Sequence, residues 1–195
     1  LFVGQDGVGK RTAAQALANR LVCGSSTGLD ACGQCGHCVR FREGTYADYL
    51  VVERATKSNG SLEKMIKVDQ IRNIQRSLAL KSFEGGKRVV AIFDADRMNS
   101  STANALLKTL EEPPDGVSFI LTSNSLSSLL PTIISRCQMI RFAPLSIESL
   151  TKIGNALEEV VEVDMVSAIA QANGSASRLV RLLSPEVDAF RLECR

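Results

Sequence analysis

The sequence predicts an α/β fold built on a parallel sheet and followed by a small helical domain. Strand-like and helix-like segments alternate up to about residue 143, a glycine-rich loop joins the first strand to the first helix, and only helical patterns follow Pro144. The 195 residues suffice for one substantial core and a small satellite domain. We therefore expect an α/β domain over residues 1–143 and a helical lid over residues 144–183.

The expected sheet consists of short apolar segments. Strands are predicted at Leu1–Gly4, Tyr49–Glu53, Arg88–Asp94, Val117–Ser123 and Gln138–Phe142. The third and fourth carry runs of apolar residues, which is typical of strands buried on both faces. Helices are predicted at Arg11–Val22, Val68–Leu80 and Ser100–Glu112, the last with a serine cap and with two prolines after its end. The polar stretch Arg54–Glu63 is predicted as a loop.

The segment after Pro144 contains helical patterns alone. Helices are predicted at Ile147–Leu157, Val163–Ala172 and Ser175–Leu183, with Asn173-Gly174 as the stop signal between the last two. Residues 184–195 are interpreted as the start of an incomplete further segment. Because the chain enters a strand at Leu1 without a Met, we also expect a segment upstream of it.

Composition excludes several classes of protein. The 23 basic and 21 acidic residues give a net charge of +2, so any contact with DNA needs a local basic patch. No run approaches the roughly 20 apolar residues that cross a bilayer, and no signal peptide is visible. A cytoplasmic location is therefore expected.

The first loop has the spacing of a phosphate-binding P-loop. Gly4, Gly7, Gly9 and Lys10 lie in GQDGVGK, after a strand and before a helix. The glycines allow backbone N–H groups to face a phosphate, and the lysine adds a positive charge. The alternative is an ordinary glycine-rich turn between a strand and a helix.

Two positions differ from those that ATP hydrolysis requires. A hydroxyl must follow the lysine to ligate Mg²⁺, but Arg11 has no acceptor atom and Thr12 lies one position too late. The strand ending at Asp94 is followed by Ala95, where a Glu would polarise the attacking water. Asp94 can still meet a metal, although a lone Asp after a buried strand is more typical of a turn or cap. We expect an inactive ATPase, with nucleotide binding left open.

Four cysteines have the spacing of a zinc knuckle. Residues 23–38 contain C-x₈-C-x₂-C-x₂-C, formed by Cys23, Cys32, Cys35 and Cys38. A redox pair needs only two cysteines in a thioredoxin-like context, and disulfides conflict with the cytoplasm. Four thiolates fill the coordination shell of Zn²⁺, so the predicted site is structural. His37 lies between two of these cysteines and could substitute for one as a ligand, but four cysteines suffice, so it is interpreted as a surface residue.

Three features occur in the order seen in a known family: the P-loop, the knuckle after the first helix, and Ser135-Arg136-Cys137. Ala103–Pro114 (ANALLKTLEEPP) also looks like the helix that follows the acidic strand end in that family. Together they resemble the AAA+ clamp-loader subunits of bacterial DNA polymerase III, from Leu1 to about Leu183. The resemblance implies an AAA+ P-loop NTPase-type sheet with an inserted zinc knuckle and a helical lid.

The resemblance also implies roles for single residues. The arginine of the family's Ser-Arg-Cys motif meets the ATP of a neighbouring subunit, so Arg136 is expected to be an arginine finger acting in trans. Without the resemblance, Arg136 is interpreted as a cap before the last strand. Asn124 resembles the residue called sensor 1, with Ser123 as the neighbouring candidate. The sensor 2 arginine position holds Ser177, with Arg178 one residue further on.

These departures are the ones that separate delta prime from the ATP-hydrolysing gamma/tau subunits. The resemblance implies a non-hydrolysing subunit of a DNA-directed DNA polymerase holoenzyme, which supports ATP-dependent loading of the sliding clamp on primed DNA. Its implied partners are gamma/tau and delta subunits. The alternative is an ATP-hydrolysing motor of the gamma/tau type. A zinc-knuckle nucleic-acid-binding protein is disfavoured by the few aromatic residues, and a small-molecule kinase by the missing Mg²⁺ ligand.

Overall fold

The computed structural model of the chain describes residues 1–25, 28–157 and 164–184. It divides into two compact units. Among the described residues, the α/β unit comprises 1–3, 11–25 and 28–140, and the helical unit comprises 4–10, 141–157 and 164–184. The phosphate loop therefore groups with the helical unit.

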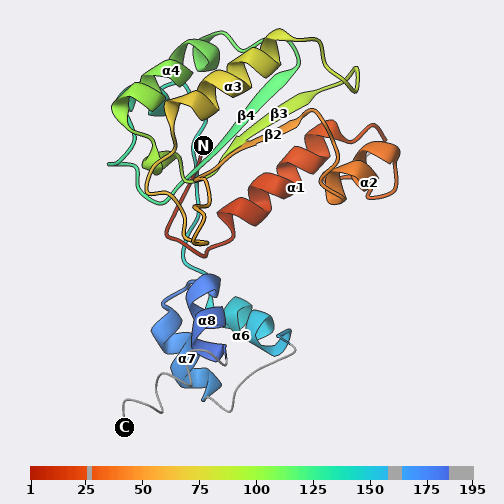
Figure 1. The fold of residues 1–195 in the computed structure, drawn as a ribbon. Helices are drawn as coiled ribbons and strands as arrows, with labels where there is room; N and C mark the ends of the chain where they lie inside the picture. The colour runs from red at the N-terminus through yellow and green to blue at the C-terminus, as the bar shows by residue number, and fades with distance from the viewer. Residues whose placement is uncertain (26–27, 158–163, 185–195) are drawn as a thin grey trace. The chain divides into compact units, whose positions relative to one another are not determined.

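The α/β unit is organised around a five-stranded sheet with the order β2-β3-β4-β1-β5. Figure 1 shows β2, β3 and β4 of this sheet side by side. The strands are β1 (Phe2–Val3), β2 (Tyr49–Val52), β3 (Arg88–Ile92), β4 (Val117–Ser123) and β5 (Ile140–Arg141). β3 pairs in parallel with β2 and β4, and β4 pairs in parallel with β1. Every residue of β3 is buried, which confirms the prediction of a central strand covered on both faces.

Helices cover both faces of this sheet. They are α1 (Lys10–Val22), α2 (Gly36–Arg42), α3 (Val68–Ala79), α4 (Ser100–Glu111) and α5 (Pro131–Ile134), with a 3₁₀ turn, η1 (Ala95–Arg97), after β3. Figure 1 shows α3 and α4 side by side on one face and α1 on the other. The side chains that α3 and α4 bury, Ile71 and Leu106 among them, join those of β3 and β4 in one core.

A buried ion pair between Arg88 and Asp48 lies at the C-terminal end of α3. Arg88 Nε donates to Asp48 Oδ1 at 2.9 Å, and the two side chains are 7% and 1% exposed. The remaining N–H groups of Arg88 donate to backbone carbonyls at the end of α3 and just beyond it, at Ser77, Leu78, Leu80 and Lys81. Carbonyls at the end of a helix lack the N–H groups of a following turn, so the arginine acts as a C-terminal cap of α3.

The helical unit contains α6 (Ile147–Asn155), α7 (Met165–Ala172) and α8 (Ala176–Leu183). Each helix begins after a capping side chain that accepts a backbone N–H, at Ser146, Asp164 and Ser175. Leu150, Ile169 and Leu179 meet in a separate core. The predicted start of the second helix at Val163 and the predicted further segment after Ser184 lie outside the described residues.

The structure corrects the sequence analysis at three elements. α2 begins inside the segment predicted to be irregular, and the short helix α5 was not predicted. The cap of α4 is Asn99, whose side chain accepts the N–H of Thr102 at 2.8 Å, and not a serine. Asparagine and serine are equally good caps, so the sequence pattern does not choose between neighbouring positions.

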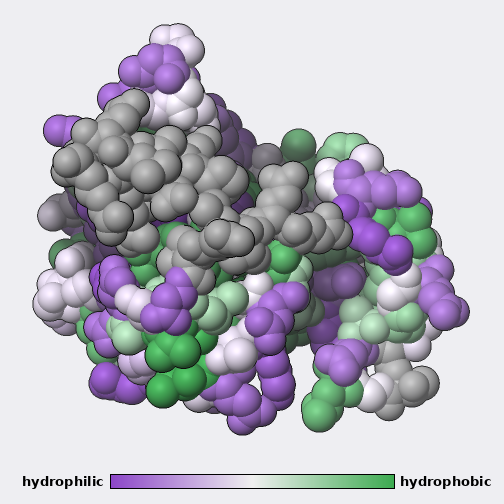
Figure 2. Space-filling model, turned by 90° about the horizontal axis from the view of Figure 1, so that it is seen from below, coloured by the Kyte–Doolittle hydropathy of each residue, from purple (hydrophilic) through white to green (hydrophobic). Residues whose placement is uncertain are grey.

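Along the described ranges, no helix combines the length and the apolar composition that crossing a bilayer requires. The face drawn in Figure 2 interleaves hydrophilic residues with smaller hydrophobic patches.

Candidate functional site

The phosphate loop has the backbone that its glycines were expected to supply. Gly7 and Gly9 have positive φ angles of 79° and 90°, which L side chains rarely adopt. A Cβ at Gly7 would also collide with Ser175 Oγ and lie 2.8 Å from Ser177 N. Conformation and close approach therefore both require glycine at this position.

Lys10 is buried within its own loop. Its Nζ donates to Gly4 O at 2.9 Å and to Gln5 O at 2.7 Å, and the residue is 7% exposed. The ammonium is thus hydrogen-bonded to loop carbonyls. A phosphate that enters this loop has to compete with these acceptors for the lysine.

The start of α8 packs against the same loop. Ala176 N donates to Gly7 O at 2.8 Å, and Gln5 Nε2 donates to Asn173 O at 2.8 Å. An ion pair of 3.8 Å also joins Asp6 to Arg181. Ser177, which stands where the resemblance predicts the sensor 2 arginine, lies beside the phosphate loop, whereas Arg178 donates its backbone N–H to Ser175 Oγ.

In the α/β unit, Arg11 has partners that the sequence analysis did not identify. Its Nη1 lies 2.7 Å from Glu53 Oε2, and its guanidinium carbon lies 4.2 Å from the centre of the Phe93 ring. The ion pair and the cation–π contact hold Arg11 between β2 and β3. Both charged side chains remain about half exposed, so the pair adds little to stability.

Asp94 also has an arginine partner. The Oδ2 atom of Asp94 lies 3.2 Å from Nη2 of Arg54, and Arg54 is the residue that follows Glu53 in the chain. Asp94 adopts the left-handed region, with φ 54° and ψ 50°, and its N–H donates to Thr122 Oγ1. A positive charge therefore already faces the carboxylate that would meet a metal ion.

The residues after Asp94 occupy different surroundings. Ala95 is 1% exposed and packs in the core. The carboxylate of Asp96 accepts the backbone N–H of Asn124 at 2.9 Å. Asp96 thus contacts the residue that resembles sensor 1, while the predicted site residues Gly4, Gly7, Gly9 and Lys10 belong to the other unit.

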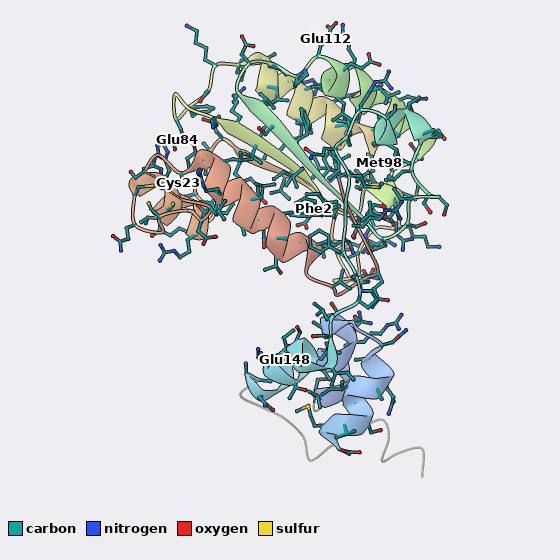
Figure 3. The ribbon with its side chains drawn as sticks, turned by 180° about the vertical axis from the view of Figure 1, so that it is seen from behind. Phe2, Cys23, Glu84, Met98, Glu112 and Glu148 are labelled. Carbon is teal, nitrogen blue, oxygen red and sulfur yellow. The ribbon has the colours of Figure 1, made fainter. Side chains whose placement is uncertain are left out.

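The four knuckle cysteines gather their sulfur atoms at the end of α1. All four are free thiols, and their Sγ atoms lie within 4.8 Å of one another. Cys23 and Cys35 are 4.0 Å apart and Cys32 and Cys38 are 3.9 Å apart, measured between Sγ atoms. A tetrahedral zinc ion with Zn–S bonds of about 2.3 Å separates its sulfur ligands by about 3.8 Å. The arrangement fits a tetrahedral metal ion, and Figure 3 shows Cys23 where α1 ends.

Backbone groups favour thiolates at this cluster. Hydrogen bonds from the backbone N–H groups of Cys38 and Gly24 lower the pKa of Cys35 to about 6, and a bond from the Cys32 N–H lowers that of Cys23. Burial raises the pKa of Cys38 to about 12. Burial thus opposes the thiolate form of Cys38, while hydrogen bonds favour it at Cys35 and Cys23. A bound divalent cation removes this conflict because it stabilises every thiolate.

His37 supports the cluster from within α2 and is not a simple surface residue. It is half-buried, its Nδ1 donates to Val22 O at 2.9 Å, and its ring lies 5.5 Å from that of Tyr46. Arg40 binds Glu84 through two hydrogen bonds. These contacts attach α2 to α1 and to the loop before β3.

Arg136 follows α5 at the surface. Its Nη1 donates to Thr132 O at 2.8 Å and to Ser135 Oγ at 3.3 Å, and its Nη2 forms an ion pair with Glu111. The side chain is 33% exposed. The neighbouring Cys137 packs against the core, and its burial raises its thiol pKa.

Sequence reasoning did not identify Glu53, Arg54 and Glu111. Each partner is far along the chain from the residue it binds, so no local pattern pairs them. In the sequence, these three residues stand out only as charged residues at or just after the end of an apolar strand or helix.

A glycine-rich loop before α1, a parallel β2-β3-β4-β1-β5 sheet and a small helical unit together form an AAA+ fold. A gamma subunit-related DNA polymerase III protein from Thermotoga maritima shares this fold, with a TM-score of 0.58 at 19% identity over 97% of this chain and 55% of that one.

Sequence comparison resolves the family. The protein-family model described as "DNA polymerase III, delta subunit" matches residues 1–146 of this chain. DNA polymerase III subunit delta′ of Pseudomonas aeruginosa is 37% identical over 183 residues, which are 93% of this chain and 54% of that protein. DNA polymerase III subunit tau of Escherichia coli is 30% identical over 167 residues, 86% of this chain and 24% of that protein. The chain belongs to the delta-prime family of DNA polymerase III clamp-loader subunits. It spans about half the length of the Pseudomonas relative.

Proposed function

We propose that this chain acts in a clamp loader as a subunit that does not hydrolyse ATP and that presents Arg136 to the nucleotide of a neighbouring ATPase. Its partners are then gamma/tau and delta subunits, and through them the sliding clamp and primed DNA. The family membership supports a role in a clamp loader, and the site geometry supports the role of a subunit that does not hydrolyse ATP itself.

The observation that carries the proposal is the pairing of both metal-site positions with charges from the chain itself. Arg11 stands where a Mg²⁺ ligand is needed and is held by Glu53 and Phe93. Asp94 is paired with Arg54. Since Ala95 offers no general base, these residues lack both the cation ligands and the water-polarising group of a hydrolysing site.

The phosphate loop supports the same proposal. Lys10 is bound to Gly4 O and Gln5 O, and Gly7 O accepts the N–H of Ala176. Nucleotide binding has to replace the lysine contacts, which weakens it by the free energy of the lost hydrogen bonds. We expect weak nucleotide binding or none.

We further propose that the knuckle holds a structural Zn²⁺ ion through Cys23, Cys32, Cys35 and Cys38. Four thiolates close the coordination shell and leave no position for a reacting water. The contacts of His37 and Arg40 with neighbouring elements make the metal part of the scaffold around α1 and α2.

The experiment that tests the trans role replaces Arg136. In a loader reconstituted with gamma/tau and delta-type subunits, Arg136→Ala is expected to lower ATP turnover roughly fivefold or more, because a guanidinium that stabilises phosphoryl charge is lost. Assembly, measured by size-exclusion chromatography, is expected to be unchanged. Arg72→Ala is the control, since Arg72 is exposed on α3 and, within the described part of the chain, forms its ion pair with its helix neighbour Asp69. Unchanged turnover with Arg136→Ala would remove the finger role.

A further inference from the structure

The guanidinium of Arg136 is held by acceptors from two separate elements. Thr132 O and Ser135 Oγ belong to α5 and its end, and both accept from Nη1. The third acceptor is the carboxylate of Glu111, the last residue of α4, which faces Nη2. Two elements far apart in sequence therefore fix both the position and the plane of one side chain.

Glu111 projects from a well-anchored helix end. Gln75 of α3 donates to Ala105 O and to Thr109 Oγ1, both at 2.8 Å, so the last turns of α4 are tied to α3. The N–H of Glu112 donates to Lys108 O, and two prolines then end the helix. The backbone that carries the Glu111 side chain is therefore held in place by these contacts.

The ion pair remains accessible at the surface. The side chains of Arg136 and Glu111 are 33% and 46% exposed, and Arg136 lines a hollow of about 310 Å³ together with Leu110 and Pro113 on either side of Glu111. An exposed pair of this kind contributes little to folding stability. It does restrict the rotamers of a long side chain, which otherwise has many.

We propose that Glu111 is a positioning residue that holds the guanidinium of Arg136 in the orientation in which it meets a neighbouring subunit's nucleotide. This inference rests on the proposed trans role of Arg136. Catalysis by a charged group depends on its placement before the reaction, and a small misplacement is costly. Glu111 thus acts on turnover through Arg136 and does not itself touch the nucleotide.

The test is Glu111→Gln in the reconstituted loader. The substitution keeps the shape but removes the charge that orients Nη2. It is expected to lower kcat for ATP roughly two- to threefold and to leave KM unchanged, because placement and not nucleotide binding is affected. In the Arg136→Ala background, Glu111→Gln is expected to change nothing further. Glu112→Gln is the matched control at the same helix end, where Glu112 is exposed and no ion pair joins it to another described residue (Figure 3).

Each outcome separates this inference from the proposed function. A drop in kcat with Arg136→Ala but not with Glu111→Gln removes the positioning role and leaves the finger role standing. A rise in kcat with Glu111→Gln shows that the carboxylate restrains the arginine, and it also overturns the inference. An equal loss in the Arg136→Ala background, or a matching loss of melting temperature, assigns Glu111 a structural role. No effect of Arg136→Ala removes both proposals.

Discussion

At the scale of single residues, two positions next to the expected metal site form ion pairs within the chain. Arg11 pairs with Glu53, and Asp94 pairs with Arg54. Arg11 could be singled out from sequence because it follows the P-loop lysine, but its partner Glu53 could not. Arg54 fell in a segment predicted only as a loop, yet it lies 3.2 Å from Asp94. Local spacing draws attention to Arg11 and Asp94, whereas their charged partners, which follow β2, become known only from tertiary contacts.

The buried pair of Asp48 and Arg88 supports a prediction on stability. Burial alone would raise the pKa of Asp48, but hydrogen bonds from Arg88, the Glu84 N–H and Ser82 lower it below its usual range. A lowered folded pKa means that the stabilisation is present above the unfolded pKa of about 4 and is lost as the pH falls through the folded value. Asp48→Asn is expected to cost about 3 kcal/mol at pH 7, because Arg88 stays buried without its counter-charge.

Urea unfolding of both proteins between pH 7 and pH 2 provides the measurement. The wild type is expected to lose stability relative to Asp48→Asn as the pH falls below about 4, so the gap between them narrows. Asp69→Asn, at an exposed position on α3, is expected to change stability by less than about 0.5 kcal/mol. A constant gap over the whole pH range would contradict the assigned role of the carboxylate.

At the scale of helices and strands, the sequence predicted what is periodic and missed what is short or held by side chains. β3, β4, α1 and the helices of the second unit follow apolar patterns that are local, and their predictions are confirmed within a few residues. α5 has four residues, too few to show a period. α2 begins between Cys35 and Cys38 of the cysteine cluster, where glycine and cysteine masked the helix. Contacts through His37 and Arg40 attach it to α1 and to the loop before β3.

Replacing a knuckle cysteine tests the metal proposal at this scale. Cys32→Ser is expected to remove about one equivalent of zinc per chain, because three thiolates leave the tetrahedral shell incomplete. Backbone amides of α2 are then expected to exchange faster with solvent, while those of β3 stay protected. Metal analysis and hydrogen exchange measure the two effects. Cys137→Ser, outside the cluster, serves as the control. Full zinc content in the Cys32→Ser protein would contradict the four-thiolate site.

At the scale of the whole molecule, the predicted order of an α/β domain and a small helical domain agrees with the fold, and the family comparisons agree with the resemblance. Sequence alone did not show that the phosphate loop groups with the helical unit. That grouping depends on contacts such as Ala176 N with Gly7 O, between residues at opposite ends of the chain. The phosphate loop and the start of α8 therefore belong to the same unit.

The most direct test of the central claim is ATP turnover by the purified protein, alone, with and without Mg²⁺. We predict no Mg²⁺-dependent turnover above background, since Arg11 and the Asp94–Arg54 pair leave no usual place for the cation and Ala95 cannot polarise water. Turnover that requires Mg²⁺ and disappears with Lys10→Ala would contradict this account. The chain would then be a motor of the gamma/tau type with an unusual metal site.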